Sequence, residues 1–129
     1  MNSKIKILIA DDEPDILEII HYHLKLEGYQ VICARNGYEA IDQSLKELPS
    51  MIILDVMMPG KSGIDACKFL RMQPQFKDTI ILFLSAINDD ATKIIAQESG
   101  SDDYITKPIR PKTLIKKINS LLITSGNKK

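Results

Sequence analysis

Five polar residues, each placed directly after a short apolar run, have the side chains best suited to chemistry. They are Asp11, Asp12, Asp55, Ser85 and Lys107. Carboxylate oxygens bind hard cations or act as nucleophiles, a hydroxyl group hydrogen-bonds an anion, and an ammonium group stabilises negative charge. The five residues are far apart in the sequence, so any joint chemistry depends on the elements that position them.

The apolar runs alternate with segments of helical spacing. Buried strands are predicted at Ile5–Ala10, Val31–Ala34, Met51–Leu54, Ile80–Leu84 and Tyr104–Thr106. Helices are predicted from Pro14 to the residue before Gly28, over Gly37–Leu48, Ser62–Met72 and Asp90–Ser99, and from Pro111 onward. Strict alternation favours right-handed crossovers and a parallel sheet covered on both faces. The predicted fold class is α/β, a doubly wound five-stranded parallel sheet, flavodoxin-like (βα)5, with strand order 2-1-3-4-5.

In such a sheet, ligands bind outside the carboxyl ends of the strands, near the point where the strand order reverses. With order 2-1-3-4-5 the first and third strands are neighbours, which brings Asp11, Asp12 and Asp55 together. Crowded carboxylates are costly without a cation, and oxygen ligands are those that Mg²⁺ prefers. The sequence therefore predicts a Mg²⁺ site that would neutralise an incoming phosphoryl group, with the ammonium of Lys107 on its oxygens.

One carboxylate remains as a nucleophile, and Asp55 is the best candidate because it follows a fully apolar strand and precedes a turn. Taken singly, the residues have plainer roles. Asp11 and Asp12 could cap the first helix, Asp55 could form a turn, and Lys107 could be a solvated charge. Their joint placement at one sheet edge favours a shared site.

Composition sets the outer limits. The 129 residues contain 17 Lys plus Arg and 17 Asp plus Glu, so no overall charge draws the chain to nucleic acid or to a membrane surface. We expect one domain over residues 1–124, a short tail or start of a linker at 125–129, no direct nucleic-acid binding and no membrane association. The apolar run after Lys4 and Lys6 ends at Asp11, too early for a signal peptide, so a cytoplasmic location is predicted.

Four motifs in order resemble the receiver domains of two-component response regulators. They are Ile9-Ala10-Asp11-Asp12-Glu13, Leu54-Asp55-Val56-Met57-Met58-Pro59-Gly60, Leu84-Ser85-Ala86 and Tyr104-Ile105-Thr106-Lys107-Pro108. The resemblance runs from Lys4 to about Ile123. It implies a regulatory phosphoacceptor domain rather than an enzyme with a separate substrate. Asp55 would receive a phosphoryl group from a histidine kinase, a phosphotransfer protein or a small phosphodonor.

The resemblance also assigns roles to the neighbours of Asp55. Asp12 would be the closer Mg²⁺ ligand and Asp11 would act through water, while Asp55 and the backbone carbonyl of Met57 would complete the protein ligands. Ser85 would bond a phosphoryl oxygen and Tyr104 would turn inward as a switch residue. The Lys107–Pro108 peptide bond is expected to be cis. The face of the fourth helix, fifth strand and fifth helix would carry the change of state and could form a homodimer.

Three alternatives use similar residues. An aspartyl phosphatase of the haloacid dehalogenase type needs a second Asp two positions after the nucleophile, where this chain has Met57. A nucleotide-binding module needs a glycine-rich loop after the first strand, where this chain has acidic residues. An interaction module that is never phosphorylated would not need to keep every acidic, hydroxyl and lysine position.

Two positions flank the expected phosphorylation site with apolar side chains. Met57 lies two residues after Asp55, and Ile87 lies two residues after Ser85. Neither side chain can orient a water molecule toward an acyl phosphate, and their bulk hinders its entry. We therefore hypothesise slow self-hydrolysis of the phosphorylated form.

Overall fold

A computed structural model describes residues 5–127, and Lys4, Lys128 and Lys129 lie outside the described residues. Five parallel strands form one sheet in the order β2-β1-β3-β4-β5, as predicted. The strands are β1 (Lys6–Ala10), β2 (Gln30–Ala34), β3 (Met51–Leu54), β4 (Ile80–Ser85) and β5 (Asp103–Thr106). The helices are α1 (Pro14–Leu26), α2 (Gly37–Glu47), α3 (Gly63–Arg71), α4 (Asp90–Glu98) and α5 (Pro111–Asn127), with a short 3₁₀ helix η2 (Pro74–Phe76).

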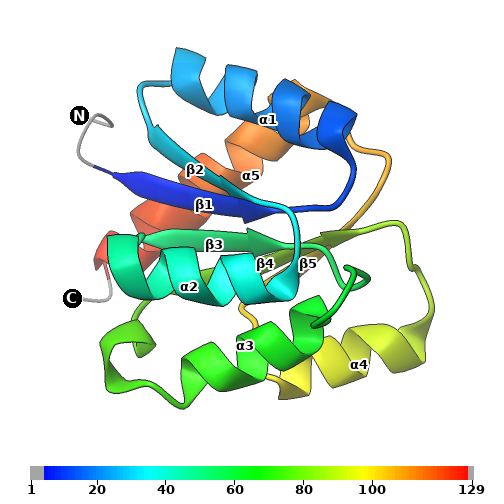
Figure 1. The fold of residues 1–129 in the computed structure, drawn as a ribbon. Helices are drawn as coiled ribbons and strands as arrows, with labels where there is room; N and C mark the ends of the chain where they lie inside the picture. Colours follow the sequence, from blue (N-terminus) through cyan, green and yellow to red (C-terminus); the bar gives the residue numbers. More distant parts are fainter. Residues whose placement is uncertain (1–4, 128–129) are drawn as a thin grey trace.

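The helices cover both faces of the sheet. Helices α1 and α5 lie on one face, and α2, α3 and α4 lie on the other (Figure 1). Alternate residues of the central strands supply the two halves of the core: Leu8 and Ile52 belong to the cluster under α2 and α3, and Ile7 and Ile53 to the cluster under α1 and α5. Because both faces are buried, β3 reads as a continuous apolar run.

Short polar side chains begin three of the helices. Asn36 accepts a hydrogen bond from the backbone of Glu39 at 2.9 Å, and Ser62 accepts one from Asp65 at 3.1 Å. Asp89 does the same for α4, at 2.8 Å from the nitrogen of Thr92. These caps satisfy backbone N–H groups that have no partner inside the helix. They fix where each helix starts after its loop.

The structure differs from the sequence prediction at the carboxyl end. Helix α5 continues through Asn127, so three of the residues expected in a tail are helical. The 3₁₀ helix η2 was not predicted, and it buries Phe76 completely. Among residues 5–127, no helix is both long and apolar enough to span a bilayer.

Candidate functional site

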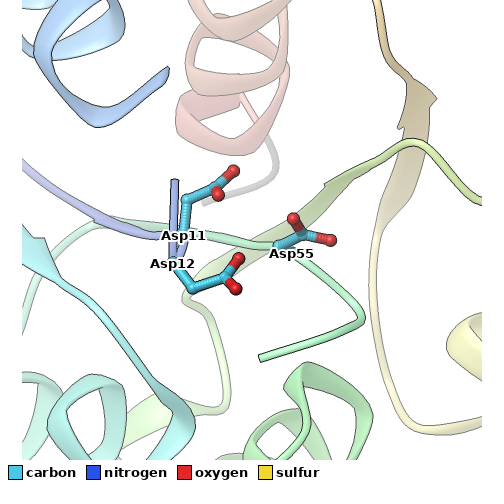
Figure 2. A group of neighbouring side chains, drawn as sticks. All are labelled: Asp11, Asp12 and Asp55. Atoms are coloured by element: carbon cyan, nitrogen blue, oxygen red, sulfur yellow. The ribbon is translucent and has the colours of Figure 1, made fainter. Parts of the chain in front are cut away.

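The three carboxylates meet because β1 and β3 are adjacent. Ala10 pairs with Leu54 in the sheet, and the next residues along the two strands are Asp11 and Asp55. The backbone N–H of Asp55 donates to the carbonyl of Ala10 at 3.0 Å. Figure 2 shows Asp11 and Asp12 after β1 and Asp55 after β3. One oxygen of each carboxylate lies within 4.8 Å of the other two.

Burial makes this cluster electrostatically costly. Asp11 is 2% exposed and Asp55 is 6% exposed, whereas Asp12 is exposed to solvent. Burial raises the pKa of Asp11, although hydrogen bonds from Lys107 and from the backbone of Glu13 oppose that rise. Neighbouring carboxylates in a site with little water disfavour one another's charged forms. A bound cation would relieve this repulsion.

Lys107 supplies part of the missing positive charge. Its Nζ lies 2.7 Å from Oδ2 of Asp11, 3.0 Å from Oδ2 of Asp55 and 3.0 Å from Oε1 of Glu13. Burial alone would lower the pKa of Lys107, but the hydrogen bonds to these carboxylates outweigh burial and raise it. The ammonium therefore stays charged in the site. The peptide bond between Lys107 and Pro108 is cis, as the resemblance implied.

Ser85 ends β4, one strand away from Asp55. It is 1% exposed, and its Oγ accepts a hydrogen bond from the backbone of Ile87 at 3.3 Å. The N–H of Lys107 donates to the carbonyl of Ser85 at 2.8 Å, which ties the ends of β4 and β5 together. The structure therefore brings the predicted hydroxyl and ammonium residues to the same edge as the carboxylates.

Tyr104 lies half-buried in β5 beside this edge. Its hydroxyl donates to the carbonyl of Ile87 at 2.6 Å, and its ring centroid lies 6.1 Å from that of Phe83. Burial raises the pKa of Tyr104. The side chain of Ile87 packs against the core cluster under α2, α3 and α4. Tyr104 thus joins β5 to the loop that follows Ser85.

Two glycines hold the loop between Asp55 and α3. A methyl group on Gly63 would overlap the carbonyl oxygen of Asp55, and one on Gly37 would overlap the carbonyl oxygen of Lys61. The loop backbone can pack this closely only because neither residue has a Cβ. Within the loop, the N–H of Met57 donates to Oδ1 of Asp55 at 3.4 Å, and the side chain of Met57 is 65% exposed.

The donor set fits a hard divalent cation. Among the described residues, Asp11, Asp12 and Asp55 form the one acidic group with ligand atoms close enough to hold a metal ion. All their donor atoms are oxygens, which is the chemistry of Mg²⁺ or Ca²⁺ rather than of zinc. The Lys107 ammonium contacts two members of this group, Asp11 and Asp55, so an anion bound beside the metal would meet positive charge from two sources.

Sequence reasoning missed two features beside the cluster. The first is Glu13, which shares the ammonium of Lys107. The second is a largely apolar cavity of about 390 Å³ between α1 and the loop from β5 to α5. Its lining includes Ile16, Ile19, Lys107 and Pro108. Two sequence features could have pointed to them: Glu13 is a third consecutive acidic residue, and Ile19 is an exposed isoleucine of α1. Neither feature identifies a contact unless the fold is known.

Comparisons with known proteins agree with this geometry. The sequence matches the family model of the response regulator receiver domain over residues 7–119. The structure is similar to that of a candidate response regulator from Chloroflexus aurantiacus J-10-fl, with 37% identity and a TM-score of 0.85, covering 92% of this chain and 97% of that one. The chemotaxis response regulator CheY4 of Vibrio cholerae gives 34% identity and a TM-score of 0.85, covering 90% and 97%.

A third similar structure is the BeF3-activated N-terminal receiver domain of Klebsiella pneumoniae RstA. It shows 31% identity and a TM-score of 0.81, and the match covers 88% of this chain and 95% of that one. The family model begins at the second residue of β1, spans the other four strands and reaches into α5. The chain therefore belongs to the family of response regulator receiver domains.

Proposed function

We propose that this receiver domain is a phosphorylation-dependent switch in which Asp55 accepts the phosphoryl group. Receiver domains of response regulators are regulatory and work in phosphorylation-dependent signalling, which sets the class of function. The observation that carries the assignment is the pairing of Asp55 with Lys107 at 3.0 Å, beside two further carboxylates. Asp55 is the member of the three that directly follows the central strand β3.

The transfer needs little from the protein beyond position and charge. An oxygen of Asp55 attacks phosphorus, and an acyl phosphate bond forms as the bond to the donor breaks. When the donor is a phosphohistidine of a histidine kinase or phosphotransfer protein, the electron pair of the P–N bond returns to the imidazole, which takes a proton. Lys107 stabilises the negative charge on the transferring oxygens. Bound Mg²⁺ supplies the remaining charge neutralisation.

The chain's own residues would hold that Mg²⁺. Asp12, Asp55 and the backbone carbonyl of Met57 are the proposed direct ligands, and Asp11 acts through water. One contact and one difference in exposure support this division. Asp11 is buried and already bonded to Lys107 at 2.7 Å, whereas Asp12 is exposed to solvent, where a hydrated cation arrives.

Ser85 and Tyr104 are the proposed switch residues. The hydroxyl of Ser85 would donate a hydrogen bond to a phosphoryl oxygen, and its Oγ now accepts one from the N–H of Ile87 at 3.3 Å. The hydroxyl of Tyr104 holds the carbonyl of the same Ile87, so a movement of this loop is coupled to β5. Such contacts shift the population toward the active form only by their extra affinity in that form.

The proposed partners bind on two sides of the domain. The apolar cavity between α1 and the β5–α5 loop opens beside Lys107, which suits it to a helix of the phosphodonor. The face of α4, β5 and α5 is the proposed surface for the change of state and for a homodimer. On that face, Ile94 and Ile95 are 55% and 47% exposed. A cytoplasmic location, where a kinase domain and Mg²⁺ are present, is proposed with these partners.

Acetyl phosphate tests the phosphoacceptor directly. The protein is incubated with Mg²⁺ and acetyl phosphate, and intact mass spectrometry follows a phosphoryl adduct that hydroxylamine removes. We expect the adduct in the wild type and in Asp42→Asn, a matched control on the exposed side of α2. Asp55→Asn should give none. An adduct that persists in Asp55→Asn would overturn the assignment.

We further propose that the acyl phosphate hydrolyses slowly because Met57 and Ile87 are apolar. Met57 is largely exposed and Ile87 packs against the core, so Met57 is the better position for the test. Met57→Asn adds a side chain that can orient water, and we expect it to shorten the lifetime of the phosphorylated domain. Loss of radiolabelled phosphate over time measures this. An unchanged lifetime in Met57→Asn contradicts the hypothesis.

A further inference from the structure

Glu13 occupies an unusual place for a helix-capping residue. It is the N-cap of α1, and its carbonyl accepts a hydrogen bond from Leu17 at 3.1 Å. Its backbone N–H donates to Oδ1 of Asp11 at 2.9 Å. The side chain makes no capping hydrogen bond. Instead, Oε1 lies 3.0 Å from Nζ of Lys107, at the far end of the sheet edge.

This contact gives the ammonium of Lys107 a third carboxylate partner, which differs from the other two in exposure and in its position outside the acidic group. The other two partners, Asp11 and Asp55, belong to the acidic group that could hold a metal ion, and their side chains are 2% and 8% exposed. Glu13 is outside that group, and its side chain is 60% exposed. It can therefore keep hold of Lys107 when a cation engages the other two carboxylates.

We propose that Glu13 is a positioning residue that sets the balance between cation binding and phosphoryl binding through its hold on Lys107. The proposal rests on the function proposed above and adds a regulator to that site. The carboxylate of Glu13 increases the negative charge that attracts Mg²⁺. The same carboxylate competes with phosphoryl oxygens for the ammonium. Glu13 therefore favours the first ligand and disfavours the second.

Opposite effects on two ligands distinguish this role from a structural one. An exposed ion pair usually contributes little to folding, and a carboxylate in a first helical turn contributes modestly through the helix dipole. Loss of either contribution would lower the affinity for both ligands or leave both affinities unchanged. Glu13→Gln removes the charge and keeps the size of the side chain. A purely structural role does not predict that one affinity falls while the other rises.

Calorimetry with two probes tests the proposal on the whole chain. The first titration uses Mg²⁺ alone, and the second uses beryllofluoride, a phosphoryl mimic, at saturating Mg²⁺. For Glu13→Gln we expect Mg²⁺ affinity to fall roughly fivefold and beryllofluoride affinity to rise by a similar factor, as expected for removing one nearby charge in a partly screened site. Glu13→Asp keeps the charge but shortens the reach. Glu13→Asp should keep the Mg²⁺ affinity of the wild type and should bind beryllofluoride more tightly than the wild type does.

Glu18→Gln is the matched control, because Glu18 is an exposed acid on the same helix. It should leave both affinities near wild type, which separates the contact with Lys107 from a change in net charge. Equal affinities in the wild type and in Glu13→Gln, or a change of both in one direction, would overturn the role of Glu13. If the wild type itself binds no beryllofluoride, the proposed phosphoacceptor function fails instead.

Discussion

Two clusters of charged residues lie at opposite ends of the same sheet, and they are satisfied to very different degrees. At the carboxyl ends of the strands, the single ammonium of Lys107 serves three carboxylates, and Asp12 adds a fourth nearby. At the opposite end, the single guanidinium of Arg71 meets three carbonyl oxygens and one carboxylate. Its acceptors are Gly100, Phe76, Thr79 and Asp102, at 2.6 to 2.8 Å.

This difference indicates that the Arg71 cluster, called here the Arg71 brace, is structural and that the Lys107 cluster is a binding site. The Arg71 cluster has its acceptors in place, and Asp102 also accepts the N–H of Ile81 at 2.9 Å, so α3, η2, β4 and the start of β5 are joined. The Lys107 cluster keeps excess negative charge, which costs stability until a cation arrives. Charged groups that are fully paired stabilise the fold, whereas the excess negative charge beside Lys107 favours the binding of a cation.

The largest effect on stability is expected from Arg71→Ala. This change removes a donor from three partly buried carbonyl oxygens and the cation paired with Asp102, and we expect the free energy of unfolding to fall by about 3 kcal/mol. Arg71→Lys should recover little, because an ammonium cannot reproduce the planar fork of donors. Urea unfolding followed by circular dichroism measures both. Lys68→Ala, at an exposed position of the same helix, is the control. A loss below about 1 kcal/mol would refute the role of Arg71.

Sequence patterns predicted the Lys107 site better than the Arg71 brace for a physical reason. Parallel strands place the residues that follow them at one edge, so Asp11, Asp55 and Lys107 could be brought together from strand positions alone. The partners of Arg71 are mostly backbone carbonyls, which every residue carries. Arg71 is also a basic residue in the last turn of a helix, where a favourable interaction with the helix dipole is enough to explain it.

Local signals likewise decided which boundaries could be predicted. The starts of α2, α3 and α4 were predicted to within one residue from helical spacing, whereas the caps Asn36 and Ser62 were found only in the structure. The close approach of Gly63 to the carbonyl of Asp55 could not be predicted, because a glycine at a helix start has several explanations. The contact between Glu13 and Lys107 depends on two loops that meet only in the folded chain.

Mg²⁺ should stabilise the folded domain by binding at the Lys107 cluster, and the gain should not depend on the Arg71 cluster. At about one hundred times the dissociation constant, a ligand specific for the folded state raises the free energy of unfolding by about 2.7 kcal/mol. We expect this gain in the wild type and in Arg71→Lys, each relative to its own metal-free form. Asp12→Asn should lose most of the gain, because it removes a proposed ligand. Urea unfolding with Mg²⁺ and with a chelator measures the difference, and an undiminished gain in Asp12→Asn would contradict the assignment.

A third polar group shows what happens when neither a partner nor a ligand is available. Among the described residues, the Oγ of Ser44 is buried and has no hydrogen-bond partner, and the side chain lies in α2 with no exposed surface. Ser44→Ala removes the unsatisfied hydroxyl and should raise the free energy of unfolding by about 1 to 2 kcal/mol.

Part of that gain would come from the better helix propensity of alanine, so Ser120→Ala on the exposed side of α5 is the matched control. It should gain about 0.5 kcal/mol or less. The excess at Ser44 measures the cost of an unmatched polar group that no ligand can relieve. If Ser44→Ala gained no more than Ser120→Ala, the hydroxyl would have a partner in solution. In that case, of the groups compared, only the carboxylates beside Lys107 would remain unmatched in the folded domain.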